Sequence, residues 1–348
     1  MDEVIRLESL RERLVVESGR ACPGTIKLYS IMRNERFFLE AFFDHYRALG
    51  VEQFLILDDD STDSSVEYFR MQPDCVLLSS DLRFGKEIAV SMPDGRVRRD
   101  RAGVLFKRVI GETFCQGEYG LYVDADEFLL LPRAVPDLRS LYRKLSARAI
   151  DAVVASLVEF YPDSVRDLKG SPEPRTFGDL VGLYPYFDAV PLVKFRSGLA
   201  PKRINGSASS RLFGDYGITL PAEPRPLVPR WLNHLLPRRP GKSATMKTPI
   251  VRWRPGVWLT DAHRSNVRPS DAVLLAFAHF KFTHRLAQKT EEAIRLRSYA
   301  GKSEKYELYA DLMSKMLSSD ARFVGPDSTR YAGPADLEQA GLLESRLD

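Results

Sequence analysis

The chain has 348 residues, 44% of them hydrophobic, and its 51 basic and 47 acidic side chains leave a net charge of only +4. This length provides an ample core for one large domain or two small ones, and the near balance of charge without a nucleic-acid-binding motif argues against a nucleic-acid partner. Three scattered cysteines, no membrane-spanning apolar run and no signal-peptide pattern argue against a disulfide framework or a membrane helix and predict a cytoplasmic protein.

The first 160 residues alternate between apolar runs typical of strands and apolar residues at helical spacing. The predicted strands are 25–32, 51–57, 75–78, 119–123 and 152–159, and the predicted helices are 37–49, 64–71, 102–114 and 136–146. This β-α-β succession predicts an α/β fold with a Rossmann-like, mostly parallel sheet that is flanked by helices and joined by right-handed crossovers. Residues 1–24 are charged and are interpreted as a lead-in segment.

The rest of the chain is less regular, with many prolines between 162 and 240. Further strands are predicted at 189–195, 248–253, 256–260 and 273–282, followed by an amphipathic helical pattern from 285 to about 318. From Asp320 onward the chain is polar, so we expect a loosely attached tail. The predicted organisation is a lead-in over 1–24, a main domain over 25–285 whose halves meet at 160/161, and C-terminal helices and tail over 286–348.

Acidic residues follow two of the predicted strands at the point where each ends. They are Asp58, Asp59 and Asp60 after the second strand, and Asp124 and Asp126 after the fourth. Because side chains at i and i+2 of a strand share a face, the last two carboxylates could aim at one ion. Buried carboxylates repel each other unless a divalent metal or a Lys or Arg neutralises them. The alternative for residues 58–63 is a solvated turn that caps the next helix.

Several of these motifs resemble one enzyme family. Residues 56–63 (Ile-Leu-Asp-Asp-Asp-Ser-Thr-Asp) resemble the V-D-D-G-S-x-D signature of family 2 glycosyltransferases, with Asp60 in place of the usual glycine. Arg33-Asn34-Glu35 is similar to the opening motif of that class, and Asp124-Ala125-Asp126-Glu127 to its metal motif. The resemblance covers about residues 25–300. It implies a GT-A fold and the transfer of a sugar from a nucleotide-sugar donor, here a UDP- or GDP-sugar, to a saccharide or lipid-linked acceptor.

The resemblance also implies roles for single residues. A leaving diphosphate needs a cation where negative charge develops, and carboxylates suit Mg²⁺ and Mn²⁺. The implied metal ligands are Asp126, Asp124, which is shared with the ribose, and His263. The implied donor-binding residues are Arg33, Asn34, Glu35, Asp58, Asp59 and Asp124. Lys281 and Lys247 are further candidates for contact with phosphate or acceptor, because each is embedded among apolar residues.

An inverting transfer, which we expect here, needs a carboxylate to deprotonate the acceptor, whereas a retaining transfer needs no such base. Glu159, at the end of the fifth predicted strand, is the first choice, and Asp188 and Asp215 remain open. Lys107 and Arg108, on the helix predicted at 102–114, are expected at the surface. The basic helix after 285 is a candidate for peripheral contact with the inner membrane.

Two other functions fit parts of the sequence. Residues 54–62 also satisfy the hhhhD-x-D-x-T pattern of haloacid-dehalogenase-like phosphatases, with Asp58 as nucleophile and Asp60 as acid. However, a complete strand and helix precede this motif, and no clear downstream acidic motif follows. The aspartate at position 60 also leaves open a non-catalytic protein that only binds a nucleotide or sugar.

Overall fold

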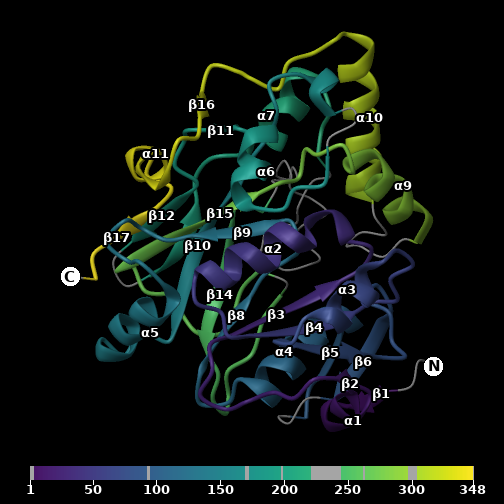
Figure 1. Cartoon of the computed structure of the whole chain (residues 1–348), viewed down its shortest axis with the longest axis vertical. Coiled ribbons are helices and arrows are strands. Elements are labelled where there is room, and N and C mark those ends of the chain that lie inside the picture. The colour runs from purple at the N-terminus through teal and green to yellow at the C-terminus, as the bar shows by residue number, and fades with distance from the viewer. Residues whose placement is uncertain are drawn as a thin grey trace, which may run out of the picture.

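The computed structural model describes residues 4–91, 95–168, 172–196, 199–220, 244–261, 263–296 and 304–347. Within these ranges a ten-stranded sheet crosses the molecule, with helices on both of its faces (Figure 1). In spatial order the strands are Glu344–Ser345 (β17), Val273–His279 (β15), Ala152–Glu159 (β10), Met246–Arg252 (β14), Tyr119–Tyr122 (β8), Lys27–Met32 (β3), Gln53–Asp58 (β4), Cys75–Ser79 (β5) and Val15–Ser18 (β2), while Glu127–Leu130 (β9) also pairs with β15.

The sheet is mixed rather than mostly parallel. The strands β8, β3, β4 and β5 are parallel neighbours, as the β-α-β succession predicts. However, β14 runs antiparallel between β8 and β10, so the fifth predicted strand does not join the first four directly. Strand β10 instead pairs in parallel with β15. The α/β class is thus confirmed, and the later half of the chain supplies the strand that links the two parallel groups.

Alternating residues of the central strands serve two separate cores. Leu28 faces one core and Tyr29 the other, as a side-chain period of two requires. The first core is covered by helices α2 (Arg36–Ala48), α3 (Ser65–Met71) and α5 (Leu138–Ala147), and the second by α1 (Leu7–Glu12) and α4 (Ala102–Phe114). The sheet therefore has both faces buried, which leaves its strand ends as the place for polar loops.

Both ends of the chain belong to the fold, which corrects two predictions. The lead-in contributes β2 to the edge of the large sheet. It also contributes β1 (Val4–Arg6) to a small sheet with β6 (Glu87–Ser91) and β7 (Val97–Arg101). The supposedly loose tail contains β16 (Ser328–Arg330), which pairs with β11 (Tyr186–Asp188), then α11 (Pro334–Gln339) and β17. Four leucines bury this tail: Leu337, Leu342, Leu343 and Leu347 lie in the core.

The later elements differ in detail from the prediction. They are α6 (Phe177–Leu183), β12 (Val193–Arg196), β13 (Leu199–Arg203), α7 (Ala208–Asp215), α9 (Leu286–Leu296) and α10 (Glu304–Ser318), with a short 3₁₀ helix at Val165–Leu168. The prediction of a strand at 256–260 is wrong: Val257 and Leu259 are buried, but they lie in a loop. Part of the proline-rich stretch, 221–243, and the junction 297–303 between the last two long helices lie outside the described residues.

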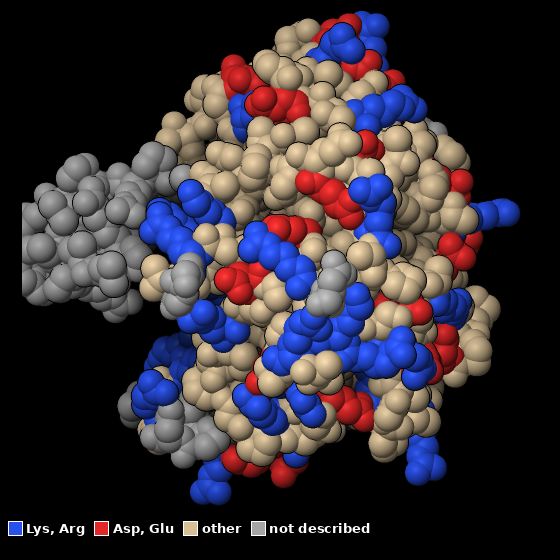
Figure 2. Space-filling model, turned by 90° about the vertical axis from the view of Figure 1, so that its left-hand side faces the viewer, with Lys and Arg blue, Asp and Glu red and all other residues tan. Residues whose placement is uncertain are grey.

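No helix in the described ranges is both long and apolar enough to cross a membrane. Figure 2 shows a face on which basic side chains gather near the centre with acidic side chains beside them.

Candidate functional site

Three polar motifs meet at one edge of the large sheet. Strand β3 lies between β4 and β8, and all three strands run in the same direction. Their carboxyl ends therefore open at the same edge, which is where open α/β sheets bind ligands. Arg33-Asn34-Glu35 follows β3, residues 58–60 end and follow β4, and residues 124–126 follow β8. The sheet thus brings the predicted motifs together.

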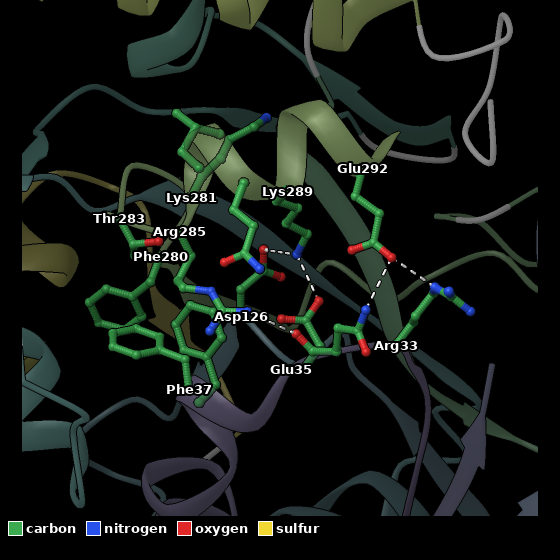
Figure 3. Close-up of a pocket in the computed structure, with 14 residues that line it drawn as sticks. Arg33, Glu35, Phe37, Asp126, Phe280, Lys281, Thr283, Arg285, Lys289 and Glu292 are labelled. Carbon is green, nitrogen blue, oxygen red and sulfur yellow. Dashed lines mark hydrogen bonds and ion pairs between the residues drawn. The ribbon is translucent and has the colours of Figure 1, made fainter. Parts of the chain in front are cut away.

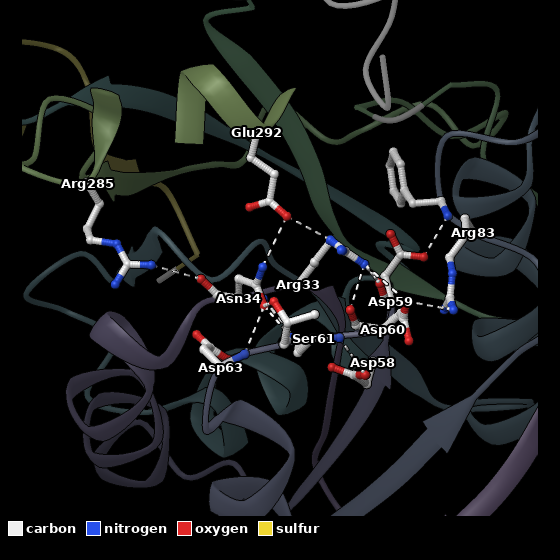
Figure 4. Close-up of polar contacts among 12 residues, drawn as sticks. Arg33, Asn34, Asp58, Asp59, Asp60, Ser61, Asp63, Arg83, Arg285 and Glu292 are labelled. Atoms are coloured by element: carbon white, nitrogen blue, oxygen red, sulfur yellow. Dashed lines mark hydrogen bonds and ion pairs between the residues drawn. The ribbon is translucent and has the colours of Figure 1, made fainter. Parts of the chain in front are cut away.

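The first two motifs are hydrogen-bonded to each other (Figure 4). The guanidinium of Arg33 donates to the backbone carbonyls of Asp59 and Asp60, both at 2.6 Å. The side-chain carbonyl of Asn34 accepts the backbone N–H of Thr62 at 2.6 Å, and the backbone N–H of Asn34 donates to the hydroxyl of Ser61. The loop after β4 is therefore fixed by the loop after β3.

The three aspartates of residues 58–60 have different surroundings. Asp58 accepts the backbone N–H of Ser61 on one oxygen at 3.0 Å, while its other oxygen is buried with no hydrogen-bond partner in the described part of the chain. Asp59 accepts the N–H of Phe84 at 2.7 Å, and burial raises the pKa of its carboxyl to about 6. Asp60 is exposed and pairs with Arg83 at 2.8 Å.

The segment after β8 is a turn rather than a strand. The N–H of Glu127 donates to the carbonyl of Asp124 at 3.1 Å, and the Glu127 carboxylate accepts the N–H of Asp124 at 2.9 Å. The chain then enters β9, which pairs with β15 beyond β14 and β10. Both ends of this turn thus belong to the same sheet. Because this turn interrupts the strand, Asp124 and Asp126 do not share a strand face, and each carboxylate pairs with a different lysine.

Asp124 belongs to a cluster with two buried lysines. The ammonium of Lys247 lies 3.1 Å from Asp124 and 2.5 Å from Glu127, and that of Lys107 lies 3.8 Å from Asp124. Tyr122 donates its hydroxyl to Asp124. Burial alone would raise the pKa of Asp124, but the two lysines hold it well below its ordinary value. Burial also lowers the pKa of Lys107 to about 8.

Asp126 belongs to a second cluster, centred on α9 (Figure 3). The ammonium of Lys289 lies 2.8 Å from Glu35 and 3.3 Å from Asp126, and His279 lies 3.7 Å from Asp126. One helical turn further on, Glu292 accepts from Arg33 and from the side chain of Asn34, both at 3.0 Å.

Together these side chains line a pocket. With its open mouth included, the pocket measures about 640 Å³, and its polar lining includes Arg33, Glu35, Asp126, Lys281, Arg285 and Lys289. Lys289 and Glu292 share one face of α9, because they are three residues apart. With this face α9 contacts all three residues of the motif after β3, and Arg285, just before α9, donates to the backbone carbonyl of Asn34.

The predicted base, Glu159, is buried next to this pocket. One of its oxygens accepts the backbone N–H of Ser209 at 2.6 Å and the other accepts the Ser209 hydroxyl at 2.7 Å. Lys281 lies 3.5 Å away and holds the pKa of Glu159 below its ordinary value despite burial. A role as base would require release from Ser209. Of the alternatives, Asp188 is held by Arg211 through two hydrogen bonds, and Asp215 is exposed.

The predicted metal ligands do not fit a divalent cation in this arrangement. His263 is half-buried, and its buried Nδ1 atom lacks a hydrogen-bond partner among the described residues. Burial, Lys247 and Lys107 together lower its pKa to about 3. The same two ammonium groups therefore lie close to both His263 and Asp124. The ammonium of Lys289 lies beside the carboxylate of Asp126. Within the described ranges, no three His, Cys, Asp or Glu side chains form a metal site.

Sequence reasoning missed the contributions of Glu127, Lys107 and Lys289 to the site, and the burial of Arg108. Glu127 closes the turn, and Lys107 and Arg108 are buried rather than at the surface. Lys289 reaches the site from a helix 163 residues beyond Asp126. The signal for Lys107 and Arg108 is the apolar run on both sides of them, since a helix that is apolar around its circumference is buried.

No family model matches the chain, and no curated protein matches it. The resemblance of its motifs to family 2 glycosyltransferases therefore stays a prediction.

Proposed function

We propose that this chain is a glycosyltransferase that moves a sugar from a UDP- or GDP-sugar to a saccharide or lipid-linked acceptor. One observation carries the proposal: three adjacent parallel strands end in Arg33-Asn34-Glu35, residues 58–60 and residues 124–126 at a single sheet edge. A nucleotide-sugar has a base and ribose at one end and a diphosphate and sugar at the other. The two acidic loops, on either side of β3, offer a place for each end.

In this proposal, different residues bind the different parts of the donor and the acceptor. Asp58 would bind the base or ribose, because it ends β4 at this sheet edge and one of its oxygens has no hydrogen-bond partner among the described residues, and Asp59 lies beside it. Asp124 and its lysines would face the diphosphate. The pocket with Glu35, Asp126 and Lys281 would receive the transferred sugar and the acceptor. An inverting transfer then needs one carboxylate to take the acceptor proton, and Glu159 remains the candidate only if Ser209 releases it.

The first experiment measures release of nucleoside diphosphate from UDP- and GDP-sugars by the full chain. No acceptor is needed, because such enzymes often transfer the sugar slowly to water. Calorimetric titration with UDP and GDP measures binding alongside. Asp58→Asn should weaken nucleotide binding about tenfold, the size of one lost charge-assisted hydrogen bond. The matched control is Asp74→Asn, which precedes β5 at the opposite end of the strands and pairs with Arg47.

Three results would contradict the proposal. Absence of binding to any nucleotide-sugar would remove its basis. Binding without turnover for any donor would leave a nucleotide-binding protein. Release of phosphate from p-nitrophenyl phosphate, lost in Asp58→Asn, would favour the phosphatase.

A further inference from the structure

We propose that the buried lysines Lys107 and Lys247 take the place of a divalent cation beside the diphosphate of the donor, with Lys107 donating hydrogen bonds to it, so that the chain binds nucleoside diphosphates without metal. This inference rests on the proposed function and names the groups that would perform its charge chemistry.

The two lysines come from different elements and are both buried. Lys107 lies on α4 and is 3% exposed, and Lys247 lies on β14 and is 1% exposed. Burying an ammonium group is costly, so two of them in one place need anionic partners. Asp124 and Glu127 supply two negative charges, which leaves the group of four without net charge. The charge balance that a metal would provide at Asp124 is thus already present in the chain.

A divalent cation at Asp124 would meet strong repulsion. Its carboxylate is contacted by one ammonium at 3.1 Å and faces a second at 3.8 Å, so a bound cation would lie within a few ångströms of both. Neither lysine can turn away into water, because both are buried. Asp126 follows the same pattern, with the ammonium of Lys289 at 3.3 Å.

Lys107 has hydrogen-bonding capacity that the described residues do not use. Lys247 is held by two carboxylates, whereas the nearest carboxylate oxygen to Lys107 is too distant for a hydrogen bond. Its ammonium lies 4.0 Å from the ring centre of Tyr122 and 5.7 Å from that of Phe84. An ammonium group carries three N–H donors, and phosphate oxygens are good acceptors for them.

The order of groups along the site matches the order along a nucleotide. Phe84 joins the two regions, because its backbone N–H binds Asp59 and its ring faces Lys107. A nucleotide with its ribose at Asp58 and Asp59 would therefore place its diphosphate toward Lys107. Asp124 is 38% exposed and forms the side of the cluster that is open to an incoming ligand.

The test is calorimetric titration of UDP and GDP into the full chain after treatment with a chelating resin, once in EDTA and once in Mn²⁺. We expect dissociation constants that agree within about threefold between the two conditions, and a loss of about tenfold or more in Lys107→Met. Lys107→Arg, which keeps the charge, should stay near the native affinity. The control is Lys27→Met, which removes an equally buried lysine paired with Glu118 at the other end of β3.

Each result has a definite meaning. Binding that appears only with Mn²⁺ overturns the inference and leaves the proposed function intact, and so does native affinity in Lys107→Met. Absence of nucleotide binding in both conditions removes the proposed function and the inference with it. Thermal melting reports whether Lys107→Met folds, and Lys107→Gln, which keeps a polar end, replaces it if it does not.

Discussion

Asp59 carries a buried carboxyl whose folded-state pKa, about 6, exceeds its ordinary value of 3.8 because burial disfavours the charge. A raised carboxyl pKa removes stability as the pH rises from the unfolded value to the folded one. The cost is therefore absent below about pH 4 and complete above about pH 6. Asp59→Asn, whose carbonyl can still accept the Phe84 N–H, should gain about 2–3 kcal/mol over the native chain at pH 7.

Urea unfolding of both proteins at pH 4, 5.5 and 7 checks this prediction. The difference should be near zero at pH 4 and should grow with pH. A difference that is the same at all three values would mean that the Asp59 carboxyl does not titrate as the structure indicates.

Asp60 shows how far a residue can depart from a family signature. Its φ is +66°, in the left-handed region where glycine is the usual residue. Aspartate is among the few other residues that adopt this conformation readily, and ion pairs with Arg83 and Arg33 accompany it here. The turn expected from the signature is therefore present without its glycine. The sequence could predict this turn, because the flanking strand and the Ser61-Thr62-Asp63 run depend on local preferences.

At the scale of elements, Trp253 packs between helix α4 and strand β8. Its indole lies against Gly111 of α4 and Gly120 of β8. A Cβ atom on Gly111 would lie 2.1 Å from the indole ring, which is buried and cannot withdraw into water. Gly111→Ala should therefore cost about 1–3 kcal/mol from overpacking, although alanine is the better helix former.

The matched control for Gly111→Ala is Gly182→Ala in α6, where a Cβ would meet nothing within 4 Å. That substitution should stabilise the chain by about 0.5–1 kcal/mol through helix propensity. Urea unfolding gives both values. A gain in both variants would show that α4 can shift away from Trp253.

Elements predicted from local pattern agree well with the structure, whereas contacts between distant elements could not be predicted. The strand before Asp58 and the helix after Asp63 follow from periodicity and capping residues. The contact of Glu292 with Arg33 joins residues 259 positions apart, and a charged helix face gives no indication of its partner. For the same reason the sequence could not show that Lys247 is the partner of Asp124.

At the scale of the whole molecule, the end of the chain completes the large sheet. Strand β17 pairs with β15, and Leu342 between α11 and β17 is fully buried. Leu342→Ala should cost about 2–4 kcal/mol, the usual range for a cavity in a core. Leu317→Ala, at a position 53% exposed on α10, should change stability by less than about 0.5 kcal/mol.

Chemical unfolding of these two variants tests whether the tail belongs to the cooperative core. Equal, small effects of the two substitutions would show that the tail is loosely attached, as its polar composition predicts. Composition was a poor guide here, because a few apolar residues are enough to bury a tail that is polar on average.

The turn that holds Asp124 and Asp126 starts in β8 and ends in β9, so both of its ends are anchored in one sheet. A segment fixed at both ends loses little conformational entropy when a ligand arrives, and it has little freedom to adapt to one. Any conformational change on ligand binding must then come from a part of the site that is not fixed in the sheet at both ends. Helix α9 meets the motif after β3 through its side chains, so entry and release of ligands would be set by how often those contacts open.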